Sequence, residues 1–218
     1  MRNERVQTTG EEIANTLTHA IGSHFGAAML AILVWQGVSS ETRVAWKVTS
    51  AAVFGASVIL LYAISSAYHL VSHAPAKRIL QILDHMAIFF LIAGSYTPFC
   101  LVSLRAVNSP LAWSIFAIEW GLAFVGVAFK VLTTGRYRFV STLSYLIMGW
   151  VAILAFMPLA RALQGPGTMW LVLGGGLYTV GCVFYLWTSL PYSHMVWHLF
   201  VLSGTVCHFF CILWHVMA

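Results

Sequence analysis

SHMVWHLFVLSGTVCHFFCILWHVM, residues 193–217, is an apolar run without Lys, Arg, Asp or Glu. As an α-helix it is long enough to cross the hydrocarbon core of a membrane, which is about 30 Å thick. Two histidines, His194 and His198, stand at its start. A polar side chain at the edge of a membrane span is costly, so both need a partner or a function.

The rest of the chain has the same character. Of its 218 residues, 60% are hydrophobic and 8% are charged, against about 25% charged in a typical soluble domain. This composition excludes a soluble fold and predicts an all-α, seven-helix transmembrane bundle that forms a single domain, residues 1–218. The expected spans are 14–36, 48–71, 79–104, 110–132, 139–160, 168–189 and 194–217.

The distribution of Lys and Arg predicts which side of the membrane each end of the chain faces. Seven of these residues fall on the side of the N-terminus and four on the other side. Because positive charges favour the cytoplasmic side, we expect a cytoplasmic N-terminus and an outside C-terminus. The seven are Arg2, Arg5, Lys77, Arg78, Lys130, Arg136 and Arg138; the four are Arg43, Lys47, Arg105 and Arg161.

This topology brings four polar residues to one face of the membrane. The second span ends near His69 on the inner side, and the third begins there with Asp84 in its first turns. The seventh span also begins inside, with His194 and His198 in its first turns. The four were chosen without the positive-inside rule, so their meeting at the cytoplasmic face is independent support for a common site.

The spacing of the histidines indicates a metal site. His194 and His198 are at positions i and i+4, stacked on one helix face about 6 Å apart. His69 is the candidate for a third ligand, and Asp84 could complete the shell or hold a water molecule on the metal. Three imidazoles and a water are typical of catalytic zinc (Zn²⁺), which lowers the pKa of that water to about 7 and polarises a carbonyl.

Ser65 lies four residues before His69, on the same helix face. Its hydroxyl could bond the metal-bound water, Asp84 or a substrate oxygen. The alternative is a serine satisfied by the carbonyl four residues before it, which is common in membrane helices.

Three residues at the start of the first span are candidates for supporting the site. Glu12, Asn15 and His19 are spaced by three and four residues, so they share a helix face directed toward the expected metal. The alternative is the polar face of an interfacial helix start, and we favour this interpretation for Glu12. We favour a role beside the ligands for His19, because a buried imidazole needs a hydrogen-bond partner.

Other notable residues have plainer interpretations. His85 points about 100° away from Asp84 on a helix, so we interpret it as interfacial rather than as a ligand. His208 lies too far along its helix to share the ion, although it could face a cavity in the bundle. The run Gly174-Gly175-Gly176 favours helix packing, with a lipid opening as the alternative.

The motifs together resemble the progestin and adipoQ receptor family, particularly its bacterial haemolysin III branch. The resemblance covers nearly the whole chain, and the opening EEIANTLTHAIG is especially like the bacterial members. The motifs that carry it are Glu12-x-x-Asn15-x-x-Thr18-His19, Ser65-x-x-x-His69, Leu83-Asp84, Gly94-Ser95-Tyr96-Thr97-Pro98 and His194-x-x-x-His198.

The resemblance implies seven membrane helices with a cytoplasmic N-terminus in the bacterial inner membrane. It also implies zinc held by His69, His194 and His198, with Asp84 and Ser65 close to the ion. Related receptors and the alkaline ceramidases are regarded as zinc-dependent hydrolases of lipid amides. Haemolysis and roles in membrane lipid homeostasis have been proposed for the bacterial members.

Three classes of function follow. The first is a zinc-dependent hydrolase of a membrane lipid amide or ester, with Asp84 as general base or water holder. The second is a membrane homeostasis or sensor protein with structural zinc. The third is a pore, such as a pore-forming haemolysin, or a transporter, although apart from Glu119 the outer half of the bundle offers little polar path.

The expected partners are membrane lipids, one of them as substrate. The net charge of +5 is spread over loops rather than clustered. This pattern favours contact with anionic lipid and argues against nucleic-acid binding.

Overall fold

The computed structural model describes residues 5–133 and 136–218 of the chain. Within these residues all regular structure is helical, as the composition predicts, and none is strand. The helices in chain order are α1 (Thr9–Val38), α2 (Val44–Leu70), α3 (Ala74–Pro98), η1 (Phe99–Leu104), α4 (Arg105–Val107), α5 (Ser109–Thr133), α6 (Arg138–Trp150), η2 (Val151–Ala155), α7 (Phe156–Leu186), α8 (Ser193–Cys211) and η3 (Ile212–Val216).

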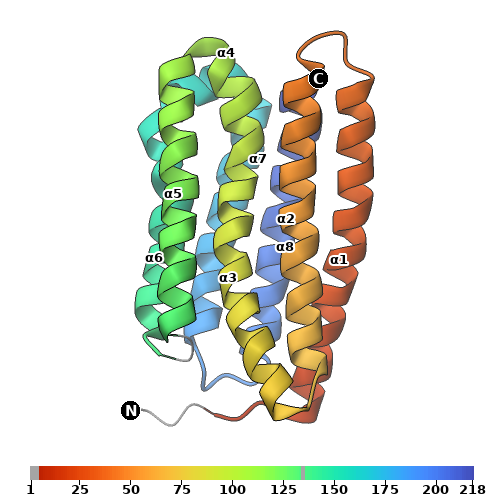
Figure 1. The fold of residues 1–218 in the computed structure, drawn as a ribbon, viewed down its shortest axis with the longest axis vertical. Coiled ribbons are helices and arrows are strands. Elements are labelled where there is room, and N and C mark those ends of the chain that lie inside the picture. The colour runs from red at the N-terminus through yellow and green to blue at the C-terminus, as the bar shows by residue number, and fades with distance from the viewer. Residues whose placement is uncertain (1–4, 134–135) are drawn as a thin grey trace.

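The long helices run side by side in an up-and-down bundle (Figure 1). The helix α1 begins at the lower end in this view, and the C-terminus lies at the upper end. Large apolar side chains are exposed along the outside of the bundle, among them Trp35, Phe124 and Leu154. Such a surface suits hydrocarbon rather than water. The chain is therefore a multi-pass membrane protein.

The number of helical stretches differs from the prediction. Six stretches in the described part of the chain are long and apolar enough to cross a membrane, rather than seven. The expected span 139–160 and most of the expected span 168–189 lie within one stretch of 49 residues, Arg138–Leu186, which ends three residues earlier than expected. The separate loop expected at 161–167 is replaced by a kink at Gln164, whose φ of 60° and ψ of 178° are not helical.

The kink has a local physical explanation. A single residue with positive φ redirects the chain, while helix continues on both sides of it. Pro166 follows two residues later, at the start of the next helical arm. Proline is tolerated there because an N–H in the first turn of a helix has no intrahelical acceptor. The Thr168 hydroxyl donates a hydrogen bond of 2.7 Å to the Gln164 carbonyl and ties the kink to the following turn.

A proline also changes the third span, Ala74–Val107. Pro98 ends the regular part of α3, and the chain continues as the π-helical segment η1. Because proline lacks an N–H and crowds the preceding turn, the hydrogen-bonding pattern changes there without ending the span.

Close packing of α1 against α2 positions the part of the bundle that carries the candidate site. A Cβ placed on Gly22 would lie 2.9 Å from Cγ of Tyr62, and one on Gly26 would lie 2.9 Å from Cγ1 of Val58. Only glycine allows this approach of the two helices. The Tyr62 hydroxyl lies 2.8 Å from Oγ1 of Thr205, so α2 also contacts α8.

Candidate metal centre

Three histidines from two helices meet at the lower end of the bundle. His69 lies in the last turn of α2, and His194 and His198 lie in the first turns of α8. One ligand atom from each lies within 4.8 Å of the others. Small rotations of the rings would bring these atoms to the Zn–N distance of about 2.0–2.1 Å. The structure thus brings together the three residues that the sequence predicts as ligands.

The buried nitrogens of the triad fit a metal ion. Within residues 5–133 and 136–218, Nε2 of His69, His194 and His198 has no hydrogen-bond partner. Leaving a buried polar atom unpaired costs about 1–3 kcal/mol, so three together need an explanation. Bound zinc would satisfy all three lone pairs at once.

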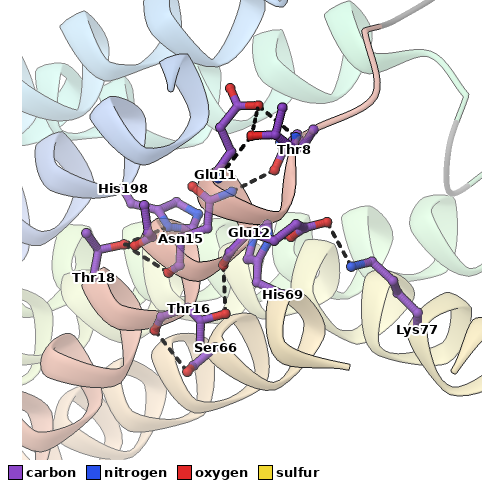
Figure 2. Close-up of polar contacts among 12 residues, drawn as sticks. Thr8, Glu11, Glu12, Asn15, Thr16, Thr18, Ser66, His69, Lys77 and His198 are labelled. Carbon is purple, nitrogen blue, oxygen red and sulfur yellow. Dashed lines mark hydrogen bonds and ion pairs between the residues drawn. The ribbon is translucent and has the colours of Figure 1, made fainter. Parts of the chain in front are cut away.

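The other nitrogen of His69 is held by a carboxylate. Glu12 Oε2 lies 2.6 Å from His69 Nδ1, and Glu12 Oε1 accepts a hydrogen bond of 2.8 Å from Lys77 Nζ (Figure 2). Because an ionised carboxylate only accepts, His69 carries its proton on Nδ1 and presents the Nε2 lone pair. A carboxylate behind a metal-binding histidine orients the ring and raises its basicity.

A hydroxyl holds His198 in the same way. Thr18 Oγ1 donates toward the carbonyls of Asn15 and Ala14, at 2.9 and 3.0 Å, and lies 3.2 Å from His198 Nδ1. Since its proton is already used, the Thr18 oxygen accepts from Nδ1–H. His198 therefore also directs its Nε2 lone pair toward the other two histidines.

The remaining predicted residues of α1 lie close to the triad. The ring of His19 stacks on that of His198, with centroids 3.4 Å apart and an angle of 13° between the planes. Neither nitrogen of His19 has a hydrogen-bond partner in the described part of the chain. The side-chain amide Nδ2 of Asn15 donates to Gln7 Oε1 at 2.7 Å, and its side-chain oxygen, Oδ1, is buried without a partner among the described residues.

Ser65 is buried, and its hydroxyl has no hydrogen-bond partner among the residues that the structure describes. The interpretation of Ser65 as satisfied by its own helix is therefore wrong in this structure. Its oxygen is available to a ligand.

Asp84 lines a polar cavity together with His69 and His194. It is not part of the group close enough to share one ion, which in the described residues consists of the three histidines. Its Oδ2 lies 4.0 Å from Nδ1 of His85. His85 lines the same cavity, although helix geometry alone places it on another face.

A second, mostly apolar cavity adjoins the polar one. It holds about 830 Å³ of space, its mouth included, and Ile88 and Trp197 line both cavities. His19 forms part of its wall near the triad. Its other lining residues come mainly from α3, α6, α7 and α8, among them Leu91, Ser95, Tyr145, Gly175, Tyr178, Cys182 and His208. Gly175 of the glycine run and His208 thus face a cavity.

Sequence reasoning missed Glu11, which joins the starts of α1 and α8. Thr8 and Glu11 form a reciprocal capping box at the start of α1, and Glu11 is also paired with Arg5. Glu11 Oε1 accepts a 2.7 Å hydrogen bond from the backbone N–H of Tyr192, just before α8. The Thr-x-x-Glu spacing is typical of a helix start, so the sequence could have revealed the capping box of Thr8 and Glu11 but not the contact with Tyr192.

The chain is thus a multi-pass helical membrane protein with a triad of histidines, two buried and one half-buried, at one end of its bundle. Comparison with known proteins gives the family.

The profile of the haemolysin-III related family matches residues 7–209. The chain is 44% identical to a hemolysin-3 of Bacillus cereus over 211 residues, 97% of this chain and 94% of that protein. It is 42% identical to the hemolysin-3 homolog of Bacillus subtilis strain 168 over 208 residues, 95% of each chain. The human monocyte to macrophage differentiation factor is 28% identical over 214 residues, 94% of this chain and 84% of that protein. The chain belongs to the haemolysin III family, which confirms the resemblance predicted from its motifs.

Proposed function

We propose that this protein is a zinc-dependent hydrolase of a membrane lipid amide or ester, with a role in membrane lipid homeostasis. One observation carries the proposal. Three buried imidazole Nε2 atoms have no partner within the described residues, the three histidines lie close enough to share one ion, and two of them line a polar cavity that adjoins an apolar one.

His69, His194 and His198 would hold the metal through Nε2. Zinc bound in this way supplies an activated water molecule and polarises a substrate carbonyl. Asp84 takes a proton from the attacking water at a carboxylate oxygen and returns it to the leaving nitrogen or oxygen. The Ser65 hydroxyl donates a hydrogen bond to a substrate oxygen. Glu12 and Thr18 keep the rings of His69 and His198 in place.

The apolar cavity supports a lipid substrate. Its wall of aliphatic and aromatic side chains suits an acyl chain, and Trp197 and Ile88 connect it to the polar cavity that contains Asp84. Gly175 has nothing within 4 Å of a Cβ placed on it, so it leaves room in the wall of α7 through which a chain can enter.

The proposal includes a topology. The two arms of Arg138–Leu186 on either side of Gln164 each cross the membrane, which gives seven crossings in the bacterial inner membrane with the N-terminus in the cytoplasm. The opposite placement of the start of α1 and the C-terminus supports an odd number of crossings (Figure 1). Reporter fusions at the two termini should respond on opposite sides of the membrane; the same side for both would contradict this topology.

A direct test of the hydrolase uses the purified protein, loaded with zinc and quantified for metal per chain. It should release fatty acid from a lipid amide, such as a ceramide, or from a lipid ester. The proposal fails if fully loaded protein leaves both classes intact while a known hydrolase turns them over in the same detergent.

A structural zinc site in a homeostasis or sensor protein is the second candidate. The observation that favours it is that the ligands join α2 to α8, and Glu12 joins α1 to α2 through His69. If zinc is structural, removing it by chelation should lower the melting temperature strongly. If zinc is catalytic, turnover should disappear while most of the stability remains.

The two Bacillus relatives are named for haemolysis, which makes pore formation an activity to test. Release of a dye from vesicles that contain the purified protein tests pore formation. A lipid hydrolase should release dye only with substrate lipid present, whereas a pore should release it from inert lipid.

A further inference from the structure

The polar cavity that His69 and His194 line has an unusual balance of charge. It holds about 720 Å³ of space, its mouth included. Lys130, Arg136 and Arg138 line it, and among the described residues that line it Asp84 is the one carboxylate. Because like charges gathered in a partly enclosed site raise its potential, the cavity attracts anions.

The position of Lys130 is not explained by membrane topology alone. Lysines at the ends of membrane helices normally extend their ammonium group to water. Lys130, near the end of α5, is instead 2% exposed and faces the cavity that contains Asp84 and His85. Lys130 also interacts within the chain, and its buried ammonium group adds a positive charge to the wall of the cavity.

The two arginines have different positions around the same space. The Arg138 guanidinium stacks over the Tyr185 ring, 4.2 Å from its centroid, and donates to the Tyr185 carbonyl. These contacts hold it in a fixed orientation. Arg136 is exposed at the mouth and also lines a neighbouring cavity with Arg78. The basic wall thus extends from the surface to the interior.

We propose that this cavity binds a phosphate group through Lys130, Arg136 and Arg138. A phosphate monoester carries a charge of about −1.5 to −2 at neutral pH and offers three acceptor oxygens. Two guanidinium groups supply paired donors that match these oxygens, and the lysine adds a point charge. The Asp84 carboxylate in the same cavity repels an anion, but the three cations outnumber it.

The adjoining cavities extend this inference to the substrate. With the phosphate in the basic cavity and an acyl chain in the apolar one, the bond between them lies beside the triad, where Ile88 and Trp197 line both spaces. The substrate class is then an acyl amide or ester with a short phosphorylated headgroup. This step rests on the proposed hydrolase function, whereas the binding of phosphate does not.

The test measures binding to the purified full-length protein in neutral detergent by calorimetry. The probes are a lysophosphatidic acid and the monoacylglycerol of the same chain, which differ only in the phosphate. We expect the lysophosphatidic acid to bind about tenfold tighter or more, the size of one or two charge-assisted hydrogen bonds. Equal affinities for the two probes would overturn the proposal.

Variants assign the preference to residues. Lys130→Met and Arg136→Gln should each reduce the preference for the phosphorylated probe by about tenfold. Lys47→Met removes another buried lysine, at the other end of the bundle, and Arg161→Gln removes an exposed arginine. Both should keep the preference. Because Arg136 is exposed, its variant serves even if Lys130→Met fails to fold; an unchanged preference in Arg136→Gln and any folded Lys130→Met contradicts the proposal.

Two further arms separate the possible causes. Inorganic phosphate that binds as tightly as the lysophosphatidic acid would assign the same basic residues to the free ion, and much weaker binding would assign them to a lipid headgroup. His194→Ala should lose metal but keep the preference, because the cations and not the metal recognise the phosphate. Loss of the preference in His194→Ala would overturn the assignment to the basic residues. Protein that binds the phosphorylated probe but hydrolyses no lipid contradicts the hydrolase and leaves the phosphate site standing.

Discussion

The two ends of the bundle bury polar groups in opposite ways. At the upper end, Lys47 is 4% exposed, and its ammonium donates to Ser40 Oγ at 2.6 Å and to the carbonyls of Met217 and Ala218 at 2.7 and 3.2 Å. Its three donors have three acceptors. At the lower end, the facing Nε2 atoms of the histidine triad have no acceptor or donor within the residues that the structure describes.

A structural polar group finds its partners inside the chain, whereas a functional one keeps an atom free for a ligand. Both ends carry the cost of removing polar groups from water. At the upper end, hydrogen bonds from Lys47 to carbonyls of the same chain compensate for this cost and hold α2 against the C-terminal segment. The histidine end fixes Nδ1 of His69 and of His198 but leaves the inward nitrogens without a partner among the described residues, as expected of a site that binds an ion.

The largest effect that we expect is the loss of zinc when a histidine of the triad is replaced. His69→Ala and His194→Ala should each reduce bound zinc from about one per chain to nearly none, because two remaining imidazoles hold zinc poorly. Elemental analysis of the purified variants measures this. His208→Ala is the matched control, since His208 is also buried on α8 but lies 3.3 Å from the Leu171 carbonyl. Zinc retained in both triad variants would rule out the site.

The next effect compares two buried carboxyl residues. Asp84→Asn should lower lipid hydrolysis by about 10²- to 10⁴-fold, the usual contribution of a general base. Zinc content and melting temperature should stay near the wild-type values. Glu119→Gln changes a carboxyl that is 0% exposed in α5 and lines neither of the two cavities beside the triad. Turnover that survives Asp84→Asn, or that falls equally in both variants, would remove Asp84 from the mechanism.

A smaller effect concerns the support behind His69. Glu12→Gln should weaken zinc binding by about 10- to 100-fold, because the amide orients the ring less strongly and does not raise its basicity. Competition with a chelator of known affinity measures the change. Glu41→Gln, the same substitution on an exposed loop residue, should leave the affinity unchanged. Equal zinc affinity in the two variants would show that the Glu12 contact does not tune the metal.

Two of the three histidines were predictable because they are close in sequence and because a polar side chain at the edge of a membrane span is energetically costly. His194 and His198 share a helix face by spacing alone, and a histidine at the edge of an apolar run draws attention wherever it occurs. His69 needed the topology, because it comes from another helix. The short connections between apolar runs supplied that topology well enough to bring α2 and α8 together at one end.

The rest depends on details that residue patterns do not contain. One residue with positive φ, Gln164, replaced an expected loop, so two expected spans became one helical stretch. Helix geometry gave the direction of the Cβ of His85 but not its side-chain rotamer, which brings the ring to the polar cavity. The pairing of Glu12 with Lys77 likewise depends on side chains from two helices that a single helix face cannot reveal.

The last prediction concerns Lys47 at the upper end of the bundle, where we expect no change in zinc content. Lys47→Met keeps the length of the side chain but leaves the Ser40 hydroxyl and two carbonyls without their donor. We expect unfolding to become easier by about 1–3 kcal/mol, the cost of unpaired buried groups, with zinc content unchanged. Denaturant titration in detergent, with zinc measured on the same samples, gives both quantities. Zinc loss without a change in stability would reverse the comparison, because it would make the upper end part of the metal site and the Lys47 contacts dispensable for the fold.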